Sequence, residues 1–178
     1  GCSLDGDADR SIFWVKKNNK LSILDGDHQL VLWCVFLKKK NINPVAVTTS
    51  YCNGSAIKFL KDNNIDIKIT GTGMKNLINE AKKYKNVVYY ENNGHGSASL
   101  EKDIILNNGN KLIYNNTIGD GIYNVFSIFQ ILEEMDMDIE EWYRLYKKIP
   151  NYQFKISSEK LPELQMNKIG NRVIKPLY

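Results

Sequence analysis

The clearest evidence for the fold class lies in residues 44–90, which read PVAVTTSYCNGSAIKFLKDNNIDIKITGTGMKNLINEAKKYKNVVYY. Three short runs of strand character, over 44–48, 65–69 and 87–90, alternate with helical patterns that begin at Ser55 and cover 74–84. Strands that alternate with helices are typical of a parallel sheet. We therefore predict an α/β fold with a mixed, largely parallel sheet and flanking helices.

Glycine-rich and polar loops follow each of these strands. They are TSYCNGS (49–55), TGTGMK (70–75) and ENNGHG (91–96). In open α/β sheets the ligand crevice lies at the carboxyl ends of the strands. We expect the three loops to converge on one site.

The chain before this region predicts a hairpin followed by a helix. Strand patterns over 11–16 and 20–24 are joined by the turn KKNN, and an acidic loop precedes them. The segment DGDHQLVLWCVFLKKK (25–40) predicts a helix that Asp25 or Asp27 caps.

After the sheet region, two core-packing helices are predicted. The first has apolar residues at helical spacing: Ile122, Val125, Phe126, Phe129 and Leu132. The second begins at Asp138 and stops at Pro150. Residues 151–178 predict a strand and a linker.

Composition narrows the classes of protein. The chain has 178 residues and a net charge of +4, and its longest apolar run, Leu30 to Leu37, is too short for a membrane span. We therefore predict no membrane partner. Because the lysines are not interleaved with aromatic residues, we also predict no nucleic-acid partner. Cys2, Cys34 and Cys52 have no metal-like spacing and are expected to be reduced thiols. These features favour a globular cytoplasmic protein, and they leave the oligomeric state open.

Asp5, Asp7 and Asp9 stand at alternate positions in GCSLDGDADR. A calcium loop of the EF-hand type is excluded, because its sixth and twelfth positions are here Arg10 and Lys16. Carboxylates at every second position can face one hard divalent ion, with other positions left for a phosphate oxygen. We predict a site for a divalent cation; the alternative is an acidic turn that contacts only water and Arg10.

The two later loops suit an anionic sugar ligand. Thr72 and Gly73 precede a helix with Lys75 in its first turn, which predicts an anion site or, alternatively, a plain helix cap. In ENNGHG, an acceptor, two amides, a glycine and a histidine suit vicinal sugar hydroxyls: Glu91, Asn92, Asn93, Gly94 and His95. The alternative is a common Asn-Gly turn beside a structural histidine. For His28 we predict only a structural role.

These motifs together resemble those of a known superfamily. DGDADR (5–10), TGMK (72–75) and ENNGHG resemble, in order and spacing, the metal, helix and sugar loops of the α-D-phosphohexomutases. Within them, ENNGHG is similar to the Glu-Ala-Asn-Gly-His-Gly loop of the phosphoacetylglucosamine mutases, and Asn93 stands where phosphoglucomutases and phosphomannomutases have Ser. YCNGSA, NNTIGDGI and EEWYRLYKKIPNYQFKI extend the resemblance over most of the chain. Asn92 departs from the usual Ala, and its amide is expected to contact substrate or face solvent.

The resemblance implies a domain organisation. Members have four domains, so residues 1–24 would be the end of the second, with the metal loop, and 25–150 the third, with the sugar loop. Residues 151–178 would lead towards the fourth. The 178 residues contain no Ser-His-Asn-Pro loop and no Arg-Pro-Ser-Gly-Thr phosphate clamp. We therefore expect the chain alone to be inert.

The resemblance also implies an activity. The full protein would interconvert N-acetylglucosamine 6-phosphate and 1-phosphate, through a phosphoserine and a bisphosphate intermediate, in UDP-N-acetylglucosamine biosynthesis. Mg²⁺ would lie on the three aspartates, with Arg10 and Lys75 as catalytic residues. Thr72, Gly73 and the 91–95 loop would bind the sugar phosphate. The alternatives are a phosphoglucomutase or phosphomannomutase, and a non-catalytic, metal-dependent sugar-phosphate binding module.

Overall fold

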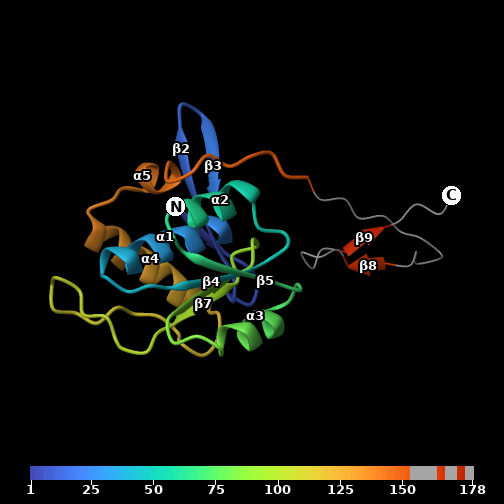
Figure 1. Ribbon diagram of the computed structural model, residues 1–178. Coiled ribbons are helices and arrows are strands. Elements are labelled where there is room, and N and C mark those ends of the chain that lie inside the picture. The colour runs from blue at the N-terminus through green and yellow to red at the C-terminus, as the bar shows by residue number, and fades with distance from the viewer. Residues whose placement is uncertain (153–163, 167–171, 175–178) are drawn as a thin grey trace.

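The computed structural model of the chain describes residues 1–152, 164–166 and 172–174 (Figure 1). Most of the strand and linker predicted over 151–178 lies outside the described residues. The β-strands are β1 (Cys2–Leu4), β2 (Ser11–Lys17), β3 (Lys20–Leu24), β4 (Val45–Thr49), β5 (Asp66–Thr70), β6 (Val87–Tyr90), β7 (Gly96–Ser99), β8 (Leu164–Met166) and β9 (Arg172–Ile174). The helices are α1 (Gly26–Lys39), α2 (Gly54–Asp62), α3 (Met74–Ala81), α4 (Gly121–Met135) and α5 (Ile139–Tyr143). None of the helices in the described part is long and apolar enough to cross a membrane.

The central sheet has the strand order β5-β4-β6-β7. β4 pairs in parallel with both β5 and β6, whereas β7 returns antiparallel to β6. The predicted mixed, largely parallel sheet with flanking helices is confirmed. The three predicted strands begin and end within one residue of the observed ones.

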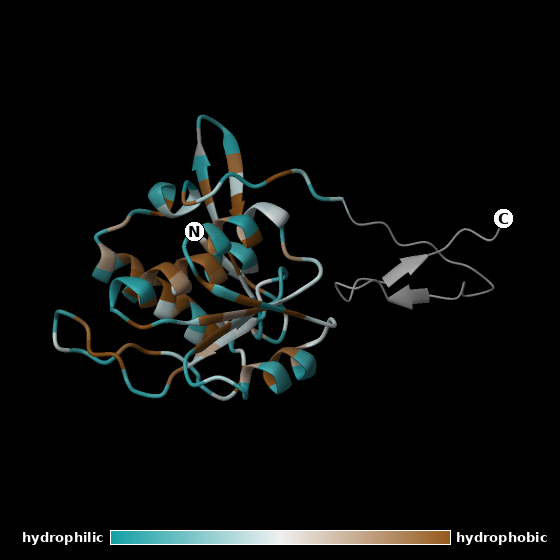
Figure 2. Ribbon diagram, viewed as in Figure 1, coloured by the Kyte–Doolittle hydropathy of each residue, from teal (hydrophilic) through white to brown (hydrophobic). Residues whose placement is uncertain are grey.

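Helices cover both faces of this sheet (Figure 1). On one face, α3 buries Leu77 and Ala81 against Val47 and Tyr89. On the other face, α1 contributes more buried residues to the larger core than any other element, and part of its ribbon is coloured hydrophobic in Figure 2. The carboxyl ends of β4, β5 and β6 therefore lie side by side between two helical layers.

A second sheet, β1-β2-β3, is antiparallel and joins the same large core. The predicted hairpin is confirmed as β2 and β3; β1, which pairs with β2, was not predicted. Phe13 of β2 is 1% exposed, and its ring lies 5.2 Å from Trp142 and 6.2 Å from Phe129, edge to face. This packing fixes the acidic loop between β1 and β2 relative to the central sheet.

Two predictions about the later helices were wrong in detail. On α4, Ile122, Phe126 and Phe129 are about half exposed, while Asn124 and Ser127 are buried. The buried side-chain amide of Asn124 has hydrogen-bond partners: it accepts from the Tyr90 hydroxyl and donates to the Gly96 carbonyl. The second helix begins as predicted, with Asp138 as its N-cap, but it ends at Tyr143, well before Pro150.

Candidate functional site

The loop of residues 5–10 connects β1 to β2, whose flanking residues Leu4 and Ser11 are paired. Ala8 has a positive φ of 57° and its amide donates to the Asp5 carbonyl, which turns the loop sharply. The turn gathers one carboxylate oxygen each from Asp5, Asp7 and Asp9 within 4.8 Å of one another. Oxygen ligands of octahedral Mg²⁺, held at about 2.1 Å, lie about 3 to 4 Å from one another, which falls within this 4.8 Å limit.

Arg10 is the cation beside these carboxylates. Its Nε lies 2.5 Å from Asp5 Oδ2 and 3.4 Å from Asp9 Oδ1, and its backbone amide donates to Asp5 Oδ1. Partial burial acts to raise the pKa of Asp5, but the hydrogen bonds and charge of Arg10 outweigh it and lower that pKa. One guanidinium against three carboxylates leaves net negative charge, so the donor set fits a divalent cation.

The acidic loop lies directly against the 91–95 loop. Ser11 donates its amide to the Gly94 carbonyl at 3.3 Å, and His95 Nδ1 lies 3.4 Å from Asp9 Oδ2. Gly94 has a φ of +92°, and a Cβ there would lie 2.1 Å from the Ser11 carbonyl oxygen. Glycine is therefore required both by the backbone conformation and by the close approach of the two loops.

The 91–95 loop is closed by its own hydrogen bonds. The Glu91 amide donates to the His95 carbonyl at 2.8 Å, and the Gly94 amide donates to the Glu91 carbonyl. The Asn93 side chain accepts from the His95 amide at 3.0 Å and donates to Glu91 Oε2 at 3.3 Å. Glu91, Asn93 and His95 are thereby held as one unit at the end of β6.

The loop after β5 meets this unit, as predicted. The Gly73 amide donates to Glu91 Oε1 at 2.8 Å. A hollow of about 290 Å³ lies between the strand ends, and it is lined by Thr49, Tyr51, Thr72, Glu91, Asn92 and Asn93. Lys75, in the first turn of α3, is exposed and is not among the residues that line this hollow.

Thr49 and Tyr51 are lining residues that the sequence analysis did not single out. Thr49 is the last residue of β4, and Tyr51 lies in the loop that follows, which was expected to join the site. The Tyr51 amide donates to Thr49 Oγ1, and Tyr51 is 50% exposed at the rim. Their position at a strand end was the available signal.

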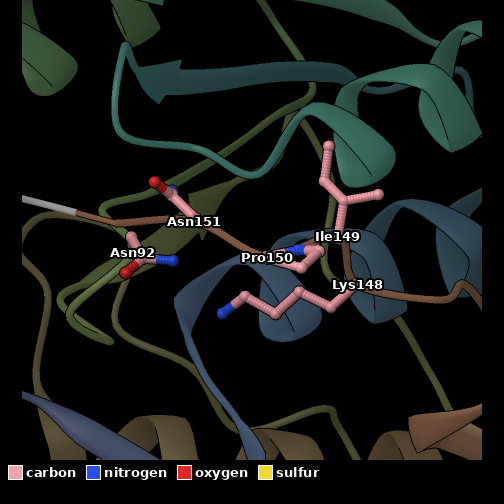
Figure 3. Close-up of a pocket in the computed structure, with 5 residues that line it drawn as sticks. All are labelled: Asn92, Lys148, Ile149, Pro150 and Asn151. Atoms are coloured by element: carbon pink, nitrogen blue, oxygen red, sulfur yellow. The ribbon is translucent and has the colours of Figure 1, made fainter.

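The side-chain amide of Asn92 is hydrogen-bonded within the chain, which neither of the two expectations, a substrate contact or a solvated amide, included. Its Nδ2 donates to Asp25 Oδ2 at 3.0 Å and to Asp27 Oδ2 at 2.7 Å. A second hollow, of about 610 Å³, lies between Asn92 and the segment Lys148–Asn151 (Figure 3). His28 is buried and hydrogen-bonded to Asp25, so its predicted structural role is confirmed.

Comparison with known proteins gives a consistent set of relatives. Residues 25–111 match the family model described as phosphoacetylglucosamine mutase AMG1, domain III. The chain is 33% identical over 184 residues to the phosphoacetylglucosamine mutase of Candida albicans and 32% identical over 175 residues to that of Schizosaccharomyces pombe. These alignments cover 86% and 84% of this chain but 34% of each relative, so the chain spans about a third of the length of the curated relatives it matches.

Solved structures agree with the sequence relatives. A crystal structure of N-acetylglucosamine-phosphate mutase in the substrate complex, a member of the α-D-phosphohexomutase superfamily, superposes with a TM-score of 0.85 at 28% identity, over 98% of this chain and 38% of that one. The Aspergillus fumigatus enzyme in complex with GlcNAc-6P and magnesium gives a TM-score of 0.73 at 25% identity, over 84% of this chain and 36% of that one.

Proposed function

The chain belongs to the phosphoacetylglucosamine mutases of the α-D-phosphohexomutase superfamily, and we propose that it forms the metal-binding and sugar-binding part of such a mutase. The proposed reaction interconverts N-acetylglucosamine 6-phosphate and 1-phosphate through a phosphoserine and a bisphosphate intermediate. Its product would enter UDP-N-acetylglucosamine biosynthesis.

One observation supports this proposal above the others. The acidic loop and the 91–95 loop come from different sheets, yet Asp9 and His95 lie 3.4 Å apart. The loop after β5 joins them through the bond between Gly73 and Glu91. A cation site beside hydroxyl-binding groups is the arrangement that phosphoryl transfer to and from a sugar requires.

The residue roles follow from this arrangement. Asp5, Asp7 and Asp9 would hold Mg²⁺, as magnesium is present in the complex of the Aspergillus fumigatus relative. When bound, the ion supplies positive charge that offsets the charge of the transferring phosphoryl group. Arg10 would add a second positive charge at the same edge.

Sugar binding is assigned to the groups that converge at the strand ends. Glu91 accepts hydrogen bonds, Asn93 both accepts and donates them, and His95 presents its ring to the acidic loop. Thr72 and Gly73 would place the start of α3 beside the ligand. Lys75 would contact the substrate only if α3 or the side chain moved towards the hollow.

The proposal is tested by a mutase assay on the complete gene product. With Mg²⁺ and a hexose bisphosphate primer, we expect conversion of N-acetylglucosamine 6-phosphate and much slower conversion of glucose 6-phosphate. Asp7→Asn is expected to lower the rate by about a hundredfold or more, because no neighbour replaces the lost anionic ligand. The exposed Asp66→Asn is the matched control and should keep full activity.

Other outcomes would select the alternatives. Preference for glucose or mannose phosphates would indicate a phosphoglucomutase or phosphomannomutase. Metal-dependent binding without turnover would favour a sugar-phosphate binding module. We propose that residues 1–178 alone are inert as a mutase, because they contain neither the serine loop nor the phosphate clamp.

A further inference from the structure

Two buried carboxylates lie beneath the 91–95 loop, at the start of α1. Asp25 is 5% exposed and Asp27 is fully buried. Asp25 caps α1 and accepts from His28 Nδ1 at 2.9 Å, while Asp27 Oδ2 accepts from the Asn53 amide at 2.8 Å. The aspartates of the acidic loop take no part in this pair, so it is separate from the candidate metal site.

Asn92 joins the loop to this pair. Both protons of its amide are used, one towards each carboxylate, at 3.0 and 2.7 Å. Its backbone carbonyl also accepts from the Gly26 amide at 3.0 Å, between the two aspartates. A Cβ at Gly26 would lie 1.8 Å from the Glu91 carbonyl oxygen, so the loop rests directly on the turn 25–27.

The charges around the pair make the Asn92 contact important. Lys148 forms an ion pair with Asp25 Oδ2. Lys148 and Asn92 both line the larger of the two hollows (Figure 3). Among the described residues, Asp27 Oδ1 has no hydrogen-bond partner although it is buried. The amide of Asn92 therefore supplies much of the compensation that a buried carboxylate needs.

From these contacts we infer that Asp25 and Asp27 form a seat that positions the 91–95 loop through Asn92. Asn92 is then a positioning residue, and it acts on Glu91 and His95 through the loop backbone. The importance of the seat for sugar binding rests on the proposed function. The seat itself does not, because it consists of contacts within this chain.

The test is backbone amide exchange of the 178-residue chain, measured by NMR in wild type and Asn92→Asp. The substitution keeps the size of the side chain but brings a third carboxylate within contact of those of Asp25 and Asp27. We expect exchange at the Gly26 and Gly94 amides to rise about tenfold, because these donors pair with loop carbonyls, while core amides of β4 are unchanged. Asn108→Asp, at an exposed turn residue whose side chain is an acceptor, is the matched control.

A rescue variant separates positioning from a general loss of stability. Asn92→Asp combined with Asp27→Asn restores one amide–carboxylate pair with the roles reversed and no change in net charge. We expect it to recover part of the lost protection at Gly94. If Asn92→Asp does not fold, Asn92→Ala replaces it and should raise exchange at the same amides by a smaller factor.

The inference is overturned if loop exchange is unchanged, if it rises equally throughout the chain, or if the double variant recovers nothing. Titration with N-acetylglucosamine 6-phosphate separates the two proposals. If the chain shows the expected exchange pattern but does not bind sugar phosphate, the proposal of the seat is supported and the proposed function is contradicted.

Discussion

Asp25 and Asp27 are two residues apart, and their surroundings drive their pKa values in opposite directions. Burial acts to raise the pKa of Asp25, but hydrogen bonds and charge from His28 and Lys148 outweigh it and hold that pKa at about 2. Burial, together with the charge of Asp25, raises the pKa of Asp27. Their surroundings therefore stabilise the ionised form of Asp25 more strongly than that of Asp27.

The lowered pKa of Asp25 gives a pH-dependent prediction for Lys148→Met. A depressed carboxyl pKa adds stability that is present above pH 4 and is lost as the pH falls towards 2. At pH 5 we expect the variant to be less stable than wild type by about 1–2 kcal/mol, because the cation that helps to hold Asp25 ionised is lost. Urea unfolding at pH 5, 4, 3 and 2 should show this difference shrinking steadily as the pH falls. A difference that stays constant over this range would contradict the account.

At the scale of single residues, the sequence could not predict the contact made by Asn92. Its neighbours in the chain suggested a substrate contact or a solvated amide, because Asp25 and Asp27 are more than sixty positions away. The same limit applies to Asp9 and His95, which come together only when two sheets pack on one core. In contrast, the cap at Asp25 was predictable, since capping depends on residues within the first turn.

At the scale of elements, prediction succeeded where a strand has branched or aromatic residues. β4, β5 and β6 are of this kind. β7 has the sequence GSAS, which has little strand preference. It forms a strand because its backbone pairs with β6 in an antiparallel ladder. On α4, apolar spacing was only partly right: Leu132 is buried, whereas Phe126 and Phe129 are about half exposed. The polar Asn124 is buried instead, because it finds hydrogen-bond partners inside.

Contact between the two loops predicts a large effect of Gly94→Ala. Gly94 and Gly109 both have positive φ, of 92° and 82°, but only Gly94 has a neighbour within 4 Å of an added Cβ. Gly109→Ala should lower the free energy of unfolding by about 1 kcal/mol, because alanine is strained in this backbone conformation. Gly94→Ala should lower the free energy of unfolding by about 2 kcal/mol more than Gly109→Ala does, because its Cβ would push the 91–95 loop away from β2. Equal losses in urea unfolding would show that the two loops do not need this close approach.

At the scale of the whole molecule, residues 1–24 and the central sheet share one hydrophobic core. The division into parts of two domains at residue 24 stays a prediction, although the family model begins at residue 25. The fold class could be predicted because strand and helix alternation is local. The approach of the acidic loop to the strand ends depends on packing between Phe13, Phe129 and Trp142, which no local pattern encodes.

The acidic loop, the loop after β5 and the 91–95 loop are proposed to form one site for a sugar phosphate and Mg²⁺. The most direct test is NMR titration of the ¹⁵N-labelled chain with N-acetylglucosamine 6-phosphate and Mg²⁺, with glucose 6-phosphate and Asp7→Asn as controls. We expect the amides of Asp9, Gly73 and His95 to shift along one saturation curve with a dissociation constant of about a millimolar, weaker for the glucose ester and for Asp7→Asn. Separate curves for the three loops, or shifts that do not depend on Mg²⁺ or on Asp7, would contradict the account.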